Sequence, residues 1–337
     1  MMLFFGLAVA LAEPSVVFVG NSYVQSNNLP RVVEGIATSI DGWTDVTTVS
    51  LTAGGLTLAD HAERMNDANS TWSEAFSGLH DWFIFQDQSQ IPGFPQTEVY
   101  WQNSLNGLRL MHEQVSTQNA RSLLMLTWGR RDGDPQNSVL YADFLAMQER
   151  LNDGYLAYAS LASTVDNPIY VAPVGPVFAH IYDTDRTVFS DLYSGDGSHP
   201  SALGSTVASM ALVSSLTGRR LTSEQVDLSM DVAEIVQNAV EETVLYDAVG
   251  TYPLPWIWTE IPEDGRIEAQ GMWPLLRIRA DQERDLHVVD GRLWVEQGRL
   301  IGTTTVDPDS EFRIAGGSQV GPVDGNVHLI DGRLRLT

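Results

Sequence analysis

The sequence predicts an α/β fold, in which a parallel sheet is covered by helices on both faces, followed by a small β-rich region. Up to about Tyr246, short apolar runs alternate with helical stretches of ten or more residues, a pattern typical of a parallel sheet. After Pro253-Leu-Pro255 the chain has short alternating segments, Asp-Gly turns and few helix signals. We therefore expect an α/β domain over residues 13–250 and a β-rich domain over 256–337.

Five apolar or β-branched runs are expected to form the sheet, and helical patterns follow them. The expected strands are residues 16–20, 45–51, 81–85, 122–127 and 168–174. The expected helices are residues 29–40, 58–65, 101–115, 139–161, 202–216 and 223–246. Open α/β sheets bind ligands at the carboxyl ends of their strands, so the residues that follow each strand are the first candidates for a functional site.

The first of these strand ends reads Gly20-Asn21-Ser22. Gly20 permits a sharp turn, and the helix expected next has Pro30 in its first turn. A strand, a tight turn, a serine and a helix are the layout of an exposed nucleophile. The alternative is that Asn21 and Ser22 cap a helix, because both are preferred N-cap residues.

Two further strand ends carry residues that suit a ligand site. Gly54-Gly55 follows the second strand, and a glycine pair can bring a backbone N–H group close to a ligand. Gln86-Asp-Gln-Ser-Gln90 follows the third strand and supplies several amides before Pro92 and Gly93 impose a loop.

A turn-rich loop contains Asp196 and His199, three residues apart, within Gly195-Asp-Gly-Ser-His-Pro200. At this spacing the carboxylate can bond the Nδ1 atom of the ring, which leaves Nε2 to take a proton from a serine. Two alternatives stay open. The pair could be a capping aspartate and a surface histidine, or it could bind a metal, although the other histidines show no ligand spacing with one another.

Composition excludes several classes of chemistry. The net charge of −24 disfavours nucleic acid and anionic lipid as partners. All 19 basic residues are arginine, so lysine Schiff-base chemistry is excluded. The absence of cysteine excludes thiol nucleophiles, disulfides and cysteine metal sites. We expect neither a metal nor a cofactor.

The two ends of the chain have distinct patterns. Residues 1–12 are apolar and end in Ala-Leu-Ala, which suits a signal peptide and predicts export. No other stretch is apolar over the length that a transmembrane helix needs. Near the carboxyl end, His287-Val-Val-Asp-Gly-Arg recurs as His328-Leu-Ile-Asp-Gly-Arg. Asp-Gly between β runs predicts hairpins, and this weak repeat is too short to indicate a solenoid.

Together, the three motifs resemble those of the SGNH, or GDSL-like, hydrolase family. Gly20-Asn21-Ser22, Gly54-Gly-Leu-Thr57 and Asp196-Gly-Ser-His199 match its first, second and last blocks in the family's order, over about residues 15–220. The resemblance implies a flavodoxin-like three-layer α/β/α fold with a five-stranded parallel sheet. It also implies a serine esterase with Ser22 as nucleophile, His199 as general base and Asp196 as its orienting carboxylate.

The same resemblance implies an oxyanion hole made of the backbone N–H groups of Ser22 and Gly55 and one side-chain amide. The family's third block normally reads Gly-x-Asn-Asp, and we align Gln88 with its asparagine; Gln86 is the alternative. Gly54 likewise remains an alternative to Gly55. The family's usual aspartate before the nucleophile is Asn21 here, a change that should leave the mechanism intact.

The expected substrates are acetyl or other small acyl esters of carbohydrates or small molecules. Tyr23, Trp128 and residues 91–95 are candidates for lining the pocket, although aromatic side chains beside strands more often belong to a core. The alternative function is a non-catalytic relative that binds carbohydrate at a cell surface. In either case the C-terminal domain could contact a polysaccharide or another cell-surface partner.

The division at residues 250–256 has a consequence for stability. We expect residues 13–250 to fold alone and to keep their activity on small esters. The alternative is that Trp256, Trp258 and Trp273 pack on the α/β domain, in which case truncation would expose apolar surface.

Overall fold

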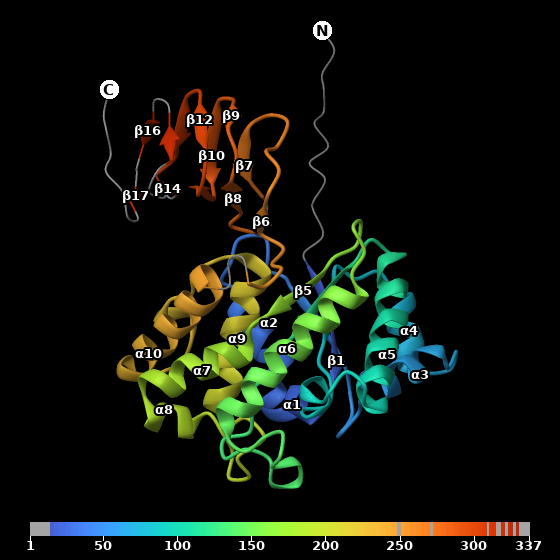
Figure 1. The fold of residues 1–337 in the computed structure, drawn as a ribbon. Helices are drawn as coiled ribbons and strands as arrows, with labels where there is room; N and C mark the ends of the chain where they lie inside the picture. The colour runs from blue at the N-terminus through green and yellow to red at the C-terminus, as the bar shows by residue number, and fades with distance from the viewer. Residues whose placement is uncertain are drawn as a thin grey trace.

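The structure, a computed structural model, contains an α/β region and a separate group of β-strands (Figure 1). These strands lie at the opposite end of the molecule from α1 (Ser22–Gln25). The expected signal peptide, residues 1–12, lies outside the described residues. The structure describes residues 14–247, 251–269, 272–308, 310–314, 318–320, 323–325 and 328–329.

The α/β region is built on five parallel strands in the order β2-β1-β3-β4-β5. The register runs through the central strand, where Val17 lies beside Val49 of β2 and Phe83 of β3. The order is that of flavodoxin-like sheets. The interior strands β1, β3 and β4 are buried, apart from the first residues of β1 and β4, because helices cover both of their faces. The strands are β1 (Ser15–Gly20), β2 (Thr47–Thr52), β3 (Trp82–Phe85), β4 (Arg121–Met125) and β5 (Ile169–Ala172).

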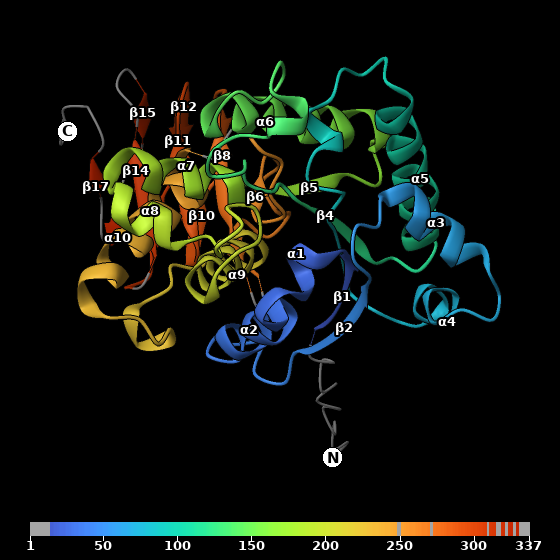
Figure 2. The ribbon, with the colours of Figure 1, turned by 90° about the horizontal axis from the view of Figure 1, so that it is seen from below.

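Helices lie on both sides of this sheet, which confirms the predicted three-layer fold (Figure 2). On one side α3, α5 and α6 contact one another in sequence, and on the other α2 contacts α9. Three of the helices, α4, α7 and α8, were not expected from the sequence. The helices are α2 (Leu29–Ala37), α3 (Leu58–Asn66), α4 (Thr71–Ser77), α5 (Val99–Ser116), α6 (Phe144–Ala162), α7 (Val174–Thr184), α8 (Arg186–Asp191), α9 (Ala202–Thr217) and α10 (Met230–Val240).

Polar caps decide where several of these helices begin. Thr57 and Asp60 form a reciprocal capping box at the start of α3. The sequence predicted that this helix begins at residue 139. The side chain of Asp143 instead accepts a hydrogen bond from the Ala146 N–H group, so α6 begins after Asp143. None of the helices in the described part of the chain has the length and apolarity needed to cross a bilayer.

The C-terminal strands form three parallel sheets, so this region is a three-sided parallel β-helix. The first sheet has the order β16-β13-β10-β7, the second β17-β14-β11-β8-β6 and the third β15-β12-β9. The strands are β6 (Ile257–Trp258), β7 (Arg266–Glu268), β8 (Leu275–Ile278), β9 (Gln282–Glu283), β10 (Leu286–Asp290), β11 (Arg292–Val295), β12 (Arg299–Ile301), β13 (Thr304–Val306), β14 (Glu311–Ile314), β15 (Gln319–Val320), β16 (Val323–Gly325) and β17 (His328–Leu329).

This arrangement confirms the β-rich region but corrects the expectation of hairpins. β10 ends at Asp290, and only Gly291 separates it from β11, yet these two strands belong to different sheets and do not pair with each other. Each strand pairs instead with its counterparts one coil away, so Arg292 lies beside Leu275 and Glu311. The Asp-Gly pair therefore lies at a corner of the coil. The region is a solenoid, which the short sequence repeat did not indicate. The repeated motif from residue 330 onward lies outside the described residues.

The β-helix has its own apolar interior, distinct from the core of the α/β region. Alternate residues of its second sheet point inward, such as Leu276, Leu293 and Phe312. The outward residues of the same sheet instead face the α/β region, where Leu275 is buried and Trp294 packs against the main core. The two cores therefore lie on opposite faces of one sheet.

The segment that joins the regions packs with the α/β core. Trp256 is fully buried in that core, and its indole N–H donates to the Ser215 carbonyl at 3.1 Å. The Pro253 carbonyl accepts a hydrogen bond from the Val171 N–H of β5 at 2.9 Å. For Trp256, these contacts agree with the alternative prediction that the tryptophans after residue 250 pack on the α/β region. The domain boundary itself stays a prediction.

Arg292 holds the β-helix to this segment. Its buried guanidinium lies 4.5 Å from the ring centroid of Trp256 and 4.7 Å from that of Trp273. Burial lowers the pKa of Arg292 to about 9, which leaves it charged at neutral pH. The two aromatic faces stabilise this charge together with the Gly218 and Trp273 carbonyls, which accept hydrogen bonds from Arg292 Nη2.

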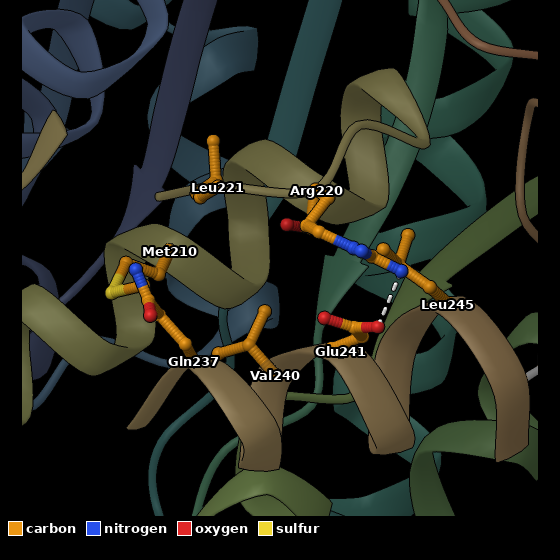
Figure 3. A pocket seen from close by; sticks show the side chains of 8 residues that line it. Met210, Arg220, Leu221, Gln237, Val240, Glu241 and Leu245 are labelled. Atoms are coloured by element: carbon orange, nitrogen blue, oxygen red, sulfur yellow. Dashed lines mark ion pairs between the residues drawn. The ribbon is translucent and has the colours of Figure 1, made fainter. Parts of the chain in front are cut away.

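A second set of contacts reaches the β-helix from the last helices of the α/β region. Figure 3 shows the crevice between the end of α9 and α10, where Arg220 forms an ion pair with Glu241 at 2.6 Å. Arg220 also donates to the Tyr246 hydroxyl at 2.9 Å, and Arg313 of β14 lies over the Tyr246 ring. This crevice is lined by residues of α9 and α10 and of the segments that follow them, and it contains none of the predicted catalytic groups.

Candidate active site

The strand end before Ser22 requires a glycine. A Cβ atom at Gly20 would lie 2.6 Å from the Val24 side chain and 2.8 Å from the Gln86 side-chain oxygen, closer than real contacts allow. Asn21 caps α1, since its side-chain oxygen accepts the Tyr23 N–H at 3.2 Å. Ser22 is the first residue of α1, so Asn21 alone has the capping role that the sequence left open for both residues.

The structure brings Ser22, His199 and Asp196 together, although they come from opposite ends of the α/β region. The Ser22 Oγ atom lies 2.8 Å from the His199 Nε2 atom. The His199 Nδ1 atom lies 2.6 Å from the Asp196 Oδ2 atom. A carboxylate can only accept, so Nδ1 carries the proton, and Nε2 is left to accept the serine proton.

The short loop between Asp196 and His199 fixes the carboxylate. The Asp196 Oδ1 atom accepts the backbone N–H groups of Ser198 and His199, each at 2.9 Å. Desolvation raises the pKa of Asp196, but these bonds and the one from the His199 ring outweigh it and lower the pKa well below its usual range. Asp196 is therefore ionised whenever the site is folded at ordinary pH.

Two aromatic side chains hold this loop from beneath. The Tyr23 hydroxyl lies 2.7 Å from the Ser198 Oγ atom, and the Trp128 indole N–H donates to the Ser198 carbonyl at 3.1 Å. The two rings are stacked with centroids 4.8 Å apart, and both are buried. Tyr23 and Trp128 therefore belong to the core and support the loop, as the alternative reading of these aromatic side chains expected. Within residues 91–95, Ile91 is buried as well.

The Gly54-Gly55 turn lies beside Asn21. The Asn21 side-chain N–H donates to the Leu56 carbonyl at 3.1 Å, which ties this turn to the strand end that carries Ser22. Gly55 has a φ of +71°, a conformation that favours glycine, and no side chain occupies the space where its Cβ would lie. Gly54 has ordinary backbone geometry, so the requirement for glycine is specific to Gly55.

The two candidate amides differ sharply in their surroundings. Gln86 is fully buried, and its side-chain oxygen accepts the Asn21 N–H at 3.0 Å, while its Nε2 donates to the Asp87 carbonyl. Gln88 is only partly buried, and its Nε2 donates to the Gln90 side-chain oxygen at 2.9 Å. Since an Nε2 group has two hydrogens, Gln88 keeps a second N–H for a ligand.

Asp87 is a residue whose importance the sequence did not reveal. Its buried carboxylate accepts the Leu58 N–H at 3.0 Å, the Gln88 N–H at 2.8 Å, the Ser104 hydroxyl at 3.0 Å and the Tyr158 hydroxyl at 3.1 Å. It therefore joins the loops after β2 and β3 to two helices. Desolvation raises the pKa of Asp87 to about 6 despite these four donors. A carboxylate two residues after the fully apolar strand β3 was the available signal.

The described residues contain no cluster of three or more histidine, aspartate or glutamate side chains that could hold a metal ion. The buried His61 is bonded through its Nδ1 atom to the Trp72 indole N–H at 2.8 Å, so that atom belongs to the core. The arrangement at Ser22 can instead make a nucleophile by proton transfer alone.

Comparison with known proteins agrees with this fold. No protein-family model and no curated protein matches the chain. Among solved structures, a DUF4886 family protein from Bacteroides uniformis is 18% identical, with a TM-score of 0.56, over 69% of this chain and 95% of that one. At this identity, the similarity shows a shared fold.

Two other solved structures have lower TM-scores. A protein from Slackia heliotrinireducens described as a candidate SGNH hydrolase is 20% identical, with a TM-score of 0.48, over 60% of this chain and 97% of that one. A catalytic mutant of Axe2, an acetylxylan esterase from Geobacillus stearothermophilus, is 14% identical, with a TM-score of 0.43, over 60% of this chain and 93% of that one.

Proposed function

We propose that this protein is a serine ester hydrolase that acts through an acyl-enzyme. One observation carries the proposal: Ser22 Oγ lies 2.8 Å from a histidine nitrogen whose ring is held from the other side by a carboxylate at 2.6 Å. These distances are within hydrogen-bond reach, as a nucleophile, its base and an orienting group require.

In the first half-reaction, the Ser22 hydroxyl gives its proton to His199 Nε2 while Oγ attacks the ester carbonyl carbon. The carbonyl oxygen becomes an oxyanion in a tetrahedral intermediate. His199 then protonates the departing alcohol, and an acyl group remains on Ser22. Asp196 stabilises the imidazolium without accepting its proton.

In the second half-reaction, water takes the place of the alcohol. His199 removes a proton from the water, the resulting hydroxyl attacks the acyl carbon, and the bond to Ser22 Oγ breaks as His199 returns the proton to Oγ. The products are a carboxylic acid and the free enzyme. Every proton that moves is carried by His199, so the chemistry requires no metal.

We propose that the backbone N–H groups of Ser22 and Gly55 and the Gln88 side chain stabilise the oxyanion. The left-handed backbone of Gly55, the bond between Asn21 and the Leu56 carbonyl, and the partial exposure of Gln88 support this choice. Gln86 is the weaker candidate because both ends of its amide bond to the protein interior.

The proposed substrates are acetyl or other small acyl esters of carbohydrates or small molecules. The net charge of −24 favours neutral substrates over anionic ones, since the summed field of the surface repels like charge. We propose further that residues 1–12 direct export, which the N-terminal sequence of the mature protein would test. We also propose that the β-helix contacts a polysaccharide or another cell-surface partner.

Hydrolysis of p-nitrophenyl esters of increasing chain length tests this function. We expect the highest kcat/KM for acetate, a fall with longer chains, and no hydrolysis by Ser22→Ala. If purified wild-type protein hydrolysed none of these esters and did not react with a fluorophosphonate, the protein would instead be a non-catalytic carbohydrate-binding relative.

A further inference from the structure

A chain of side-chain amides leads away from Gln88 to a buried charge. The Gln88 Nε2 atom donates to the Gln90 Oε1 atom at 2.9 Å, and the Gln90 Nε2 atom donates to the Asp134 Oδ2 atom. Gln88, Gln90 and Asp134, called the amide chain below, link the loop after β3 to the loop after β4. None of the three motifs in the sequence includes Gln90 or Asp134.

Asp134 is a fixed and ionised end of the amide chain. Its side chain is almost completely buried and forms an ion pair with Arg130 Nη1 at 2.8 Å. It also accepts the Asn137 side-chain N–H at 2.7 Å and the Gln136 backbone N–H at 3.1 Å. Burial raises the pKa of Asp134, but the bonds from Asn137 and Gln90 and the charge of Arg130 outweigh it, and the pKa is lowered.

The charge on Asp134 determines how both amides are oriented. A carboxylate only accepts, so the Gln90 NH₂ group must face it, and the Gln90 oxygen must face Gln88. The Gln88 NH₂ group then faces Gln90. A second hydrogen bond fixes the same orientation of the Gln88 amide independently. The Gln88 Oε1 atom accepts the Gln90 backbone N–H at 2.8 Å, and a backbone N–H can only donate.

The main chain around the amide chain is held as firmly as the side chains. The Tyr141 hydroxyl donates to the Gln90 carbonyl at 2.5 Å, and the Tyr141 carbonyl accepts the Asp134 N–H at 2.9 Å. Tyr141 itself is fully buried. One rigid residue therefore sets the distance between the two loops that the amide chain crosses.

We propose that Gln90 and Asp134 are positioning residues that fix the Gln88 amide so that its remaining N–H donates to the oxyanion. The inference rests on the proposed esterase function and extends it. Gln88 is one methylene longer than the asparagine of the family's third block and has one more rotatable bond. The amide chain removes the freedom that this bond adds, which preorganises the donor before the oxyanion forms.

The test is a double-mutant cycle on Gln88 and Gln90, measured with p-nitrophenyl acetate. Gln88→Ala should lower kcat by about 10²–10³-fold with KM little changed. Gln90→Met, which keeps the length of the side chain and removes its hydrogen bonds, should lower kcat about tenfold or more. In the Gln88→Ala background, Gln90→Met should have no further effect on kcat, because it acts only through Gln88.

Gln114→Met is the matched control. Gln114 is a partly buried residue of α5 whose amide donates to the Phe76 carbonyl, so this variant loses an amide hydrogen bond that is not part of the amide chain. It should change neither kcat nor KM. If Gln90→Met misfolds, as judged by circular dichroism, Gln90→Leu replaces it in the cycle.

Three outcomes would overturn the inference: wild-type kcat in Gln90→Met, wild-type kcat in Gln88→Ala, or losses that multiply in the double variant. Each of these requires an active wild-type enzyme. Failure of the proposed function is a different result, namely a wild-type protein that hydrolyses no ester.

Discussion

The two regions of the molecule each contain a histidine paired with an aspartate. Among the described residues, a third side chain bonds the histidine ring of the first pair but not that of the second. In the α/β region His199 bonds Asp196 at 2.6 Å, and in the β-helix His287 bonds Asp307 at 2.8 Å. Both histidine side chains are 37% exposed. The difference is Ser22, which lies against the free nitrogen of His199.

The architecture of each region accounts for this difference. Parallel strands joined by helices bring loops from distant parts of the sequence to one edge of the sheet, as the bonds between Asn21 and the Asp87 carbonyl and between Tyr23 and Ser198 illustrate. In the β-helix, polar side chains pair mostly with the next coil, as Arg299 does with Asp281 and Arg277 with Glu296. A coil stacks each residue on its neighbour and so brings few distant residues together.

The largest expected effect concerns the two histidines directly. His199→Ala and Ser22→Ala should each lower kcat by at least about 10⁴-fold, because nucleophile and base act as a unit. Asp196→Asn should lower kcat less than either of these variants. His287→Ala, the matched variant in the β-helix, should leave kcat unchanged. Steady-state kinetics on p-nitrophenyl acetate checks all four, and comparable losses in His287→Ala and His199→Ala would remove the distinction between the regions.

The next prediction separates the two amides after β3. Gln88→Ala should lower kcat by about 10²–10³-fold. Gln86→Ala should lower kcat less but should destabilise the fold, because it leaves the buried Asn21 N–H unpaired at a cost of about 1–3 kcal/mol. Kinetics and urea unfolding of both variants make the comparison. The reverse order of kcat losses would transfer the oxyanion role to Gln86.

The junction between the regions should affect stability more than activity. Trp256→Ala should lower the free energy of unfolding by about 3–5 kcal/mol, since the side chain is fully buried in the α/β core. Activity on small esters should persist below the unfolding transition, because α1, which begins at Ser22, lies at the opposite end of the α/β region from β6 (Figure 1). Ile301→Ala, at an exposed position of the third sheet, should be nearly neutral.

This prediction also bears on the earlier expectation that residues 13–250 fold alone. That fragment lacks Trp256, so we expect it to be less stable than the full chain and to expose apolar surface. A fragment with the melting temperature of the intact protein would show that the residues after 250 add nothing to the α/β core.

The smallest effect is a difference in pH dependence. The folded pKa of Asp87 is raised to about 6, so its contribution to stability is present below its unfolded pKa and is lost as pH rises through 6. The unfolding free energies of wild type and Asp87→Asn should therefore diverge by up to about 3 kcal/mol between pH 4 and pH 7. The pKa of Asp281 is instead lowered by its bonds to Arg299, so its contribution to stability should be lost as pH falls and not as it rises. Urea unfolding at several pH values measures these free energies. If the unfolding free energies of wild type and Asp87→Asn had the same pH dependence, the raised pKa of Asp87 would be contradicted.

Much of the α/β region could be predicted because its signals are local. Each strand is an apolar or β-branched run. Ser22 and Gly55 follow two of these runs, and His199 is marked by Asp196 three residues earlier in a turn-rich loop. The β-helix could not be recognised, because strands that alternate inward and outward residues look alike in hairpins and in coils. What distinguishes them is the partner strand, and Arg292 pairs with Leu275 and Glu311 on neighbouring coils.

The choice between Gln86 and Gln88 also depended on information that the sequence lacks. The two residues are two positions apart after the same strand, and both carry an amide. Only the fold shows that Gln86 is enclosed beneath Asn21 while Gln88 is partly exposed and joined to Gln90. Tertiary contacts, not residue type, separate the two.

The most direct measurement of the central claim is the site of covalent labelling by a fluorophosphonate, read by mass spectrometry of peptides from the treated protein. The account predicts one adduct, on the peptide that contains Ser22, formed in parallel with the loss of esterase activity and absent from Ser22→Ala. Full loss of activity with the adduct on another residue, or undiminished ester hydrolysis by Ser22→Ala, would contradict it.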